Sequence, residues 1–127
     1  MRRAARLLVL AVLPALLLTG LLSGCGGDEP EGPKASPNGQ VKTMTAKVEK
    51  GAVTPNAEKV EVTAGTTIKI TATSDMKDTV HVHGYDKSLE LSPGQPGTLE
   101  FVADTTGEFE IESHGTDKLI YQLVVQP

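Results

Sequence analysis

The stretch Val60-Glu61-Val62-Thr63-Ala64-Gly65-Thr66-Thr67-Ile68-Lys69-Ile70 contains two runs in which apolar and polar residues alternate. Alternation with a period of two places the apolar side chains on one face of an extended strand. Ala64-Gly65 interrupts the pattern, and glycine is favoured where a chain must turn. The stretch therefore predicts two β-strands joined by a tight turn.

The same period continues on both sides of this stretch. Met44, Ala46 and Val48 alternate with polar residues before it. Further short runs separated by turn-forming residues follow it, at 79–83, 88–91, 98–102, 108–112 and 119–125. No segment shows a helical stripe of apolar residues. Residues 41–127 therefore predict a single all-β domain, an antiparallel β-sandwich of seven to eight strands.

The chain begins with a targeting segment. Three arginines within the first six residues precede an uncharged apolar run from Leu7 to Leu18, which is the order of a secretory signal. The segment ends in Leu22-Ser23-Gly24-Cys25, which resembles the bacterial lipobox, where cleavage precedes a cysteine whose thiol carries diacylglycerol. An ordinary signal peptide or an uncleaved anchor is the alternative, although the run is shorter than the roughly 20 residues that span a bilayer. We expect a signal peptide over 1–24, lipidation of Cys25, and attachment to the outer, extracytoplasmic side of the cell membrane.

Residues 25–40 are rich in glycine, proline and charged residues and predict a flexible tether. The full chain carries 12 basic and 16 acidic side chains, and removal of the arginine-containing signal would make the remainder more acidic. This charge argues against nucleic acid and against electrostatic docking on anionic lipid. The expected partner is thus the membrane, through the lipid anchor, and we expect a monomer. A protein partner cannot be named from the sequence.

Two of the three histidines lie in the stretch Asp78–Asp86, as His81-Val82-His83. Side chains two residues apart share one face of a strand, with their bases about 6.5–7 Å apart. Two imidazoles placed in this way can converge on one metal ion. The spacing is equally compatible with polar residues on the wet face of a half-buried strand. If Val80 and Val82 face the core, the histidines face outward, and an ion would bind at a surface or an interface.

Several landmarks, taken in order, resemble those of cupredoxins. They are the stretch Val60–Ile68, the histidine strand, Leu91-Ser92-Pro93-Gly94, Phe101 and Gly107-Glu108-Phe109-Glu110. The resemblance covers roughly residues 41–125 and implies a Greek-key β-sandwich with copper near one end. In that family a histidine on a middle strand is one ligand. A cysteine, a second histidine and often a methionine come from the loop before the last strand.

The family's ligands match this chain only in part. His81 stands at the place of the first histidine ligand, and His114 at that of the loop histidine. The blue-copper cysteine would fall at Ser113, and a hydroxyl cannot replace the thiolate of such a site. Leu119 occupies roughly the place of the axial methionine. A blue-copper electron carrier is therefore not expected.

What the resemblance leaves is a site made of His81, His83 and His114. Glu112 or Asp86 could add an oxygen ligand. Nitrogen and oxygen donors without thiolate suit Cu(II), with Zn(II) or another divalent metal as alternatives, and copper is favoured by affinity order. The His-x-His spacing alone also resembles ligand pairs of multicopper oxidases and carbonic anhydrases.

The sequence thus predicts a lipid-anchored, extracytoplasmic and non-catalytic binding module that holds a divalent metal, with copper favoured. The alternative is a metal-free envelope domain with a structural or protein-interaction role. A metal-dependent hydrolase or oxidase is not expected, because a hydrolytic metal site needs an open coordination position, which the sequence does not show. No acid–base carboxylate pair stands out either, and the adjacent Ser113 and His114 point apart on a strand. The polar run from Asp75 to Asp78 is interpreted as an exposed turn.

Overall fold

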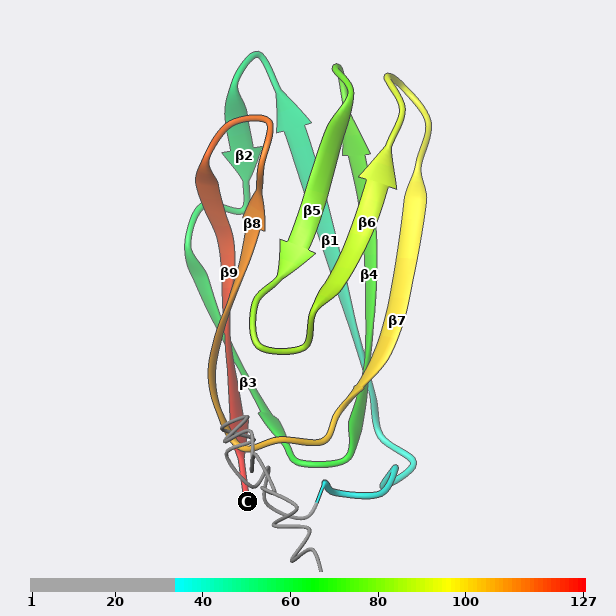
Figure 1. The fold of residues 1–127 in the computed structure, drawn as a ribbon, viewed down its shortest axis with the longest axis vertical. Helices are drawn as coiled ribbons and strands as arrows, with labels where there is room; N and C mark the ends of the chain where they lie inside the picture. Colours follow the sequence, from blue (N-terminus) through cyan, green and yellow to red (C-terminus); the bar gives the residue numbers. More distant parts are fainter. Residues whose placement is uncertain (1–33) are drawn as a thin grey trace, which may run out of the picture.

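The computed structural model describes residues 34–127. The predicted signal peptide, Cys25 and the first part of the predicted tether lie outside the described residues. The described part folds into nine strands in two packed sheets (Figure 1), which confirms the predicted all-β sandwich. Between residues 34 and 127 no helix is long and apolar enough to cross a membrane.

Four strands form one sheet, and five form the other. The four-stranded sheet has the order β2-β1-β4-β7, with β2 Ala52–Thr54, β1 Val41–Glu49, β4 Thr66–Ser74 and β7 Gly97–Ala103. The five-stranded sheet has the order β3-β9-β8-β5-β6, with β3 Glu58–Thr63, β9 Lys118–Gln126, β8 Gly107–Ser113, β5 Asp78–Val82 and β6 Lys87–Leu91.

The alternating apolar residues of the sequence form the core between the two sheets. In β4, Ile68 and Ile70 are fully buried while Lys69 between them is exposed. Other fully buried side chains come from both sheets and include Val48, Val80, Val82, Ile111, Ile120 and Leu123. Burial of these branched side chains supplies the main driving force for packing the sheets.

Two pairings differ from the antiparallel arrangement that the sequence predicted. β1 runs parallel to β4, and β3 runs parallel to β9. Each pair joins strands that are not consecutive in the chain, and parallel neighbours require such crossover connections. The short strand β2, which pairs with the end of β1, is the one strand beyond the predicted seven to eight.

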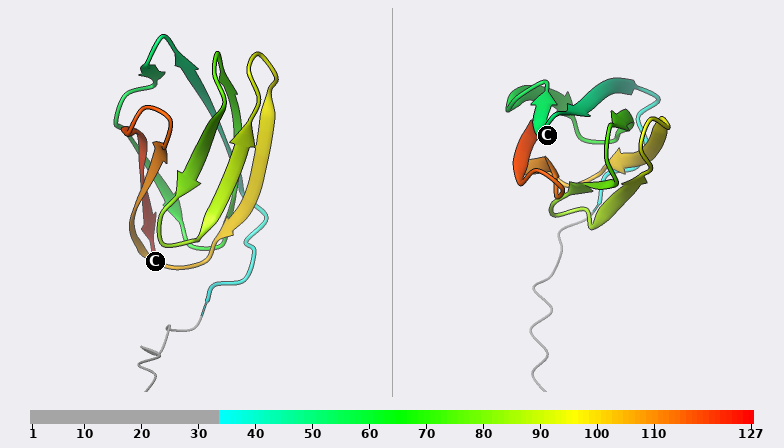
Figure 2. Two further views of the ribbon diagram at one scale, coloured as in Figure 1. Left: turned by 45° about the horizontal axis from the view of Figure 1, so that its top comes forward. Right: turned by 90° about the horizontal axis from the view of Figure 1, so that it is seen from above.

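The two ends of the described chain lie at the same end of the sandwich. The segment before β1 hydrogen-bonds there, through the Ala35 amide to the Asp104 carbonyl (2.8 Å) and the Asn38 amide to the Gly65 carbonyl (2.9 Å). The C-terminus leaves β9 at that end, whereas the turn between β8 and β9 lies toward the opposite end (Figure 1, Figure 2). The β8–β9 turn is thus remote from the point where the chain enters the domain.

Candidate metal centre

The orientation of β5 decides where its histidines point. Val80 and Val82 are fully buried in the core, so His81 and His83 project from the outer face of the five-stranded sheet. The two side chains are 20% and 43% exposed. The candidate centre is therefore a surface feature, and not an enclosed site between the sheets.

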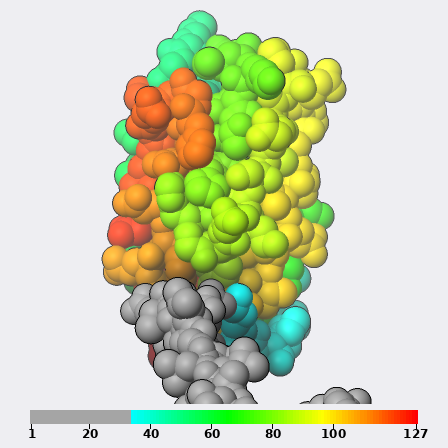
Figure 3. Space-filling view, viewed as in Figure 1, coloured from blue at the N-terminus to red at the C-terminus, as the bar shows by residue number. Residues whose placement is uncertain are grey.

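The neighbouring strand β8 brings the third histidine to the same place. β8 runs antiparallel to β5 with Glu112 opposite His81, and His114 directly follows the end of β8. The His114 amide donates to the Thr79 carbonyl at 3.0 Å, which holds the turn against β5. The β8–β9 region and β5 lie side by side on the face drawn in Figure 3.

The three imidazole rings form one cluster. The centroid of the His81 ring lies 4.5 Å from that of His83 and 5.1 Å from that of His114, and the remaining pair is 6.4 Å apart. Each histidine offers one ring nitrogen such that these atoms all lie within 4.8 Å of one another. Nitrogens bound to a common ion at about 2.0–2.1 Å are about 3–4 Å apart. Small side-chain rotations are therefore enough to close the cluster on a metal.

One donor atom in the cluster has no partner. Nδ1 of His81 is buried and makes no hydrogen bond to any described residue. A buried polar atom left in this state is destabilising, and most such atoms in proteins are satisfied. An imidazole nitrogen is a good ligand for copper, zinc and nickel, so the donor set fits a divalent metal.

Glu112 belongs to the cluster as well. One of its carboxylate oxygens, Oε1, hydrogen-bonds Nε2 of His83 and lies 3.7 Å from Nε2 of His114. The pairing of β8 with β9 shifts register between Ile111 and Glu112, and such irregularities re-aim side chains. Asp86, the other acid considered from the sequence, is fully exposed and has Oδ1 3.9 Å from Nε2 of His81. Glu112 is the better placed of the two.

The turn that follows β5 is held in place by aromatic packing and a hydrogen bond of Tyr85. Tyr85 packs against Phe101 and Phe109, with ring centroids 5.0 and 4.6 Å apart. Its hydroxyl donates to the Thr105 carbonyl at 2.9 Å. Gly84 has a φ of +78° and approaches the Phe109 ring so closely that a Cβ there would lie 2.5 Å from Cδ1. These contacts hold the end of β5 and therefore the position of His83.

Ser113, at the place of the blue-copper cysteine, points away from the histidines. It lies on the inward face of β8, is fully buried, and donates a 2.6 Å hydrogen bond to Oδ2 of Asp78. Asp78 itself is only 4% exposed, so the interpretation of Asp78 as part of an exposed turn is wrong. No local sequence pattern indicates that Asp78 is buried, because Ser113, which donates to it, lies 35 residues further along the chain.

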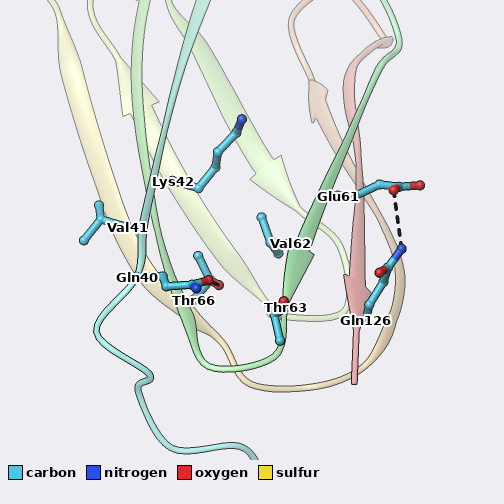
Figure 4. A pocket seen from close by; sticks show the side chains of 8 residues that line it. All are labelled: Gln40, Val41, Lys42, Glu61, Val62, Thr63, Thr66 and Gln126. Atoms are coloured by element: carbon cyan, nitrogen blue, oxygen red, sulfur yellow. Dashed lines mark hydrogen bonds between the residues drawn. The ribbon is translucent and has the colours of Figure 1, made fainter.

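Of two open hollows on the surface, one borders the histidine cluster and the other does not. One of about 420 Å³ opens beside His83 and is also lined by Gly84, Glu108, Phe109, Glu110 and Gln122. Another of about 510 Å³ lies near the start of β1 and the end of β3 and shares no residue with the cluster (Figure 4). Its polar lining includes the hydrogen-bonded pair Gln126 and Glu61. Of these two hollows, the first is lined by a histidine of the cluster, His83.

Comparison with known proteins identifies the fold but no family. No protein-family model matches the chain, and no significant match is found among curated proteins. A laccase variant from B. aclada superposes with a TM-score of 0.59 at 17% identity, over 73% of this chain and 24% of the laccase. A blue copper oxidase from Nitrosomonas europaea gives 0.58 at 16%, over 69% and 39%.

A third solved structure is closer in length to this protein. It is a chain of a heme-copper terminal oxidase dimer, with a TM-score of 0.56 at 20% identity over 78% of this chain and 74% of that one. By contrast, this chain spans about a quarter of the laccase. At such identities the likeness establishes the fold, and the fold is cupredoxin-like.

These comparisons correct one expectation from the sequence. The prediction that the chain is not an enzyme is overturned, because solved structures that share its fold include laccases and oxidases, which are enzymes. The fold is thus one on which enzymes are built.

Proposed function

We propose that this protein binds one divalent metal ion, with copper favoured, through His81, His83 and His114, as a lipid-anchored module on the extracytoplasmic side of the cell membrane. The observation that carries the metal proposal is the convergence of one nitrogen from each histidine within 4.8 Å. These are all the histidines in the sequence. The cupredoxin-like fold supports copper, since a blue copper oxidase and a heme-copper oxidase share it.

Each residue has a role that follows from its position. His81 supplies a nitrogen from β5, His83 supplies one from the position directly after β5, and His114 supplies the third from the turn after β8. Glu112 is placed to accept a hydrogen bond from a ligating imidazole or to add an oxygen ligand, and carboxylate partners of this kind fix the orientation of metal-bound histidines. Three protein ligands leave a position free for an outside ligand, as in catalytic zinc sites.

A titration with Cu(II) tests the metal proposal. The full chain, prepared in detergent without a histidine tag, should bind one equivalent of Cu(II), and electron paramagnetic resonance should show nitrogen coordination. A variant carrying both His81→Ala and His83→Ala should lose this binding. Thr79→Ala is the matched control, because Thr79 lies on the same face of β5 and bonds Glu90 (3.0 Å) instead of the cluster. Equal, weak binding by the wild type and the double variant would remove the proposal.

One observation favours the metal-free alternative, an envelope domain with a structural or protein-interaction role. Glu112 already pairs with His83 and approaches His114, so the cluster resembles an internal network of charged and polar groups. The same titration separates the two functions. Such a network predicts no stoichiometric Cu(II) binding by the wild type, and it predicts copurification of a protein partner after crosslinking in cells.

The anchoring proposal has its own test. Cells fed a labelled fatty acid should incorporate it into the wild-type protein, which should remain with the membrane fraction at high salt. Cys25→Ser should abolish labelling and release the protein from the membranes. Unchanged labelling and fractionation of the variant would contradict lipidation at Cys25.

A further inference from the structure

The carboxylate of Asp78 is buried beneath the histidine cluster and is fully engaged. Asp78 is the first residue of β5 and is 4% exposed. Its Oδ1 accepts hydrogen bonds from the amides of Thr79 (2.6 Å) and Gly115 (2.7 Å), and its Oδ2 accepts one from the Ser113 hydroxyl (2.6 Å). Burying a carboxylate is costly unless donors surround it, so these bonds are needed to keep the group inside the fold.

These bonds join the two segments that carry the histidines. Asp78 begins β5, which contains His81 and ends directly before His83, whereas Ser113 and Gly115 flank His114 on both sides. The His114 amide itself bonds the Thr79 carbonyl at 3.0 Å. Three successive residues, from the end of β8 into the turn, are thus tied to the start of β5, which fixes the backbone of His114 relative to His81.

Neither Ser113 nor Gly115 can easily accommodate a change in the groups that surround the Asp78 carboxylate. The Ser113 oxygen donates to Asp78 and already accepts from the Thr116 hydroxyl (2.9 Å) and the Thr116 amide (3.3 Å). A hydroxyl has one donor and two acceptor sites, so this oxygen is saturated. An amide nitrogen at position 78 would therefore face an oxygen with no lone pair to spare. A Cβ on Gly115 would lie 2.8 Å from Oδ1 of Asp78.

We propose that Asp78 is a positioning residue for the metal site, which acts by holding the turn that presents His114 to His81 and His83. The inference rests on the metal-binding function proposed above. Partners that orient metal ligands typically change metal affinity by about 10–100-fold when they are removed. We expect a loss of that size for Asp78→Asn, together with loss of one coordinated nitrogen.

The experiment compares Asp78→Asn with Thr66→Val in the full chain. Thr66 is an equally buried polar residue in the other sheet, where its hydroxyl contacts Asn38 and Gln40, both at 3.4 Å. Both variants are titrated with Cu(II), and coordinated nitrogens are counted by electron paramagnetic resonance. Nuclear Overhauser contacts between the His81 and His114 rings are measured without metal. With three histidines in the chain, each ring signal can be assigned.

Loss of affinity, of one nitrogen and of the ring contact in Asp78→Asn, but not in Thr66→Val, supports the proposal. Wild-type affinity and an intact ring contact in Asp78→Asn overturn it. If Asp78→Asn does not fold, Gly115→Ala replaces it, because the added methyl pushes the turn away while the carboxylate stays. Wild-type behaviour of that variant is then the overturning result. If the wild type binds no Cu(II), the metal function fails, and the ring contact alone decides the role of Asp78.

Discussion

Replacing Val82 by alanine tests the orientation of β5, on which the whole site depends. Val82 is fully buried, and the substitution removes two methyl groups from the core. At about 0.8 kcal/mol for each buried group of this size, the transfer free energy amounts to about 1.6 kcal/mol. The cavity that remains adds to this loss. We therefore expect the free energy of unfolding to fall by about 2–3 kcal/mol.

The matched substitution is His83→Ala, at the residue that directly follows Val82 and the end of β5. Its side chain is 43% exposed and bonds Glu112 at the surface, so its loss should cost no more than about 1 kcal/mol. For a domain of this size each kcal/mol lowers Tm by roughly 4–8 °C. Val82→Ala should therefore melt roughly 8–24 °C below the wild type, and His83→Ala within about 8 °C of it.

Thermal unfolding followed by circular dichroism measures both changes, with EDTA present so that bound metal does not contribute. The m-value in urea should stay the same for both variants, because neither alters the extent of the folded core. A Val82→Ala protein that melts with the wild type would refute the assigned orientation. So would a His83→Ala protein that loses as much stability as Val82→Ala.

Three further predictions follow from particular contacts. Gly84→Ala should lower the free energy of unfolding by at least about 1–2 kcal/mol, which is the usual penalty for a side chain at positive φ. The added Cβ would also clash with the Phe109 ring, which increases the loss. Thermal melts measure this change. Ser113→Cys should give Cu(II) spectra without an intense thiolate-to-copper absorption, since position 113 faces Asp78 inside the core; its appearance would show that the turn rearranges. Burial raises the pKa of Tyr121 and of Tyr85 above 10.0, so the folded state holds these protons more tightly, and the free energy of unfolding should fall as pH rises above about 10. Urea titrations across that range should give a shallower fall for Tyr121→Phe than for the wild type.

Local patterns in the sequence were sufficient for much of the fold. The alternation around Ile68 and Ile70 predicted a strand with one buried face, and both side chains are fully buried. The three-residue strand β2 is too short to show alternation. The parallel pairings of β1 with β4 and of β3 with β9 depend on long-range contacts that no local pattern encodes.

The candidate metal site, like the fold, was predictable from the sequence only in part. The shared face of His81 and His83 follows from strand geometry, but the sequence left open which face is buried, and the burial of Val82 answers that question. Asp78 was assigned to an exposed turn because it ends the stretch Asp75-Met76-Lys77-Asp78, in which three of four residues are charged. Its long-range contacts with Ser113 and Gly115, which no local pattern encodes, accompany its place in the interior.

Because the three histidines point outward, folding of the domain does not depend on the metal binding that we propose. Zinc fingers and similar small domains are unfolded until the ion arrives, because the ion completes the interior. In the described part of this protein the interior is formed mainly by valine, isoleucine and leucine side chains from both sheets. The sandwich can therefore form before any cation binds, and if the proposed site is occupied, the ions available in the medium around the folded protein would decide which one it holds.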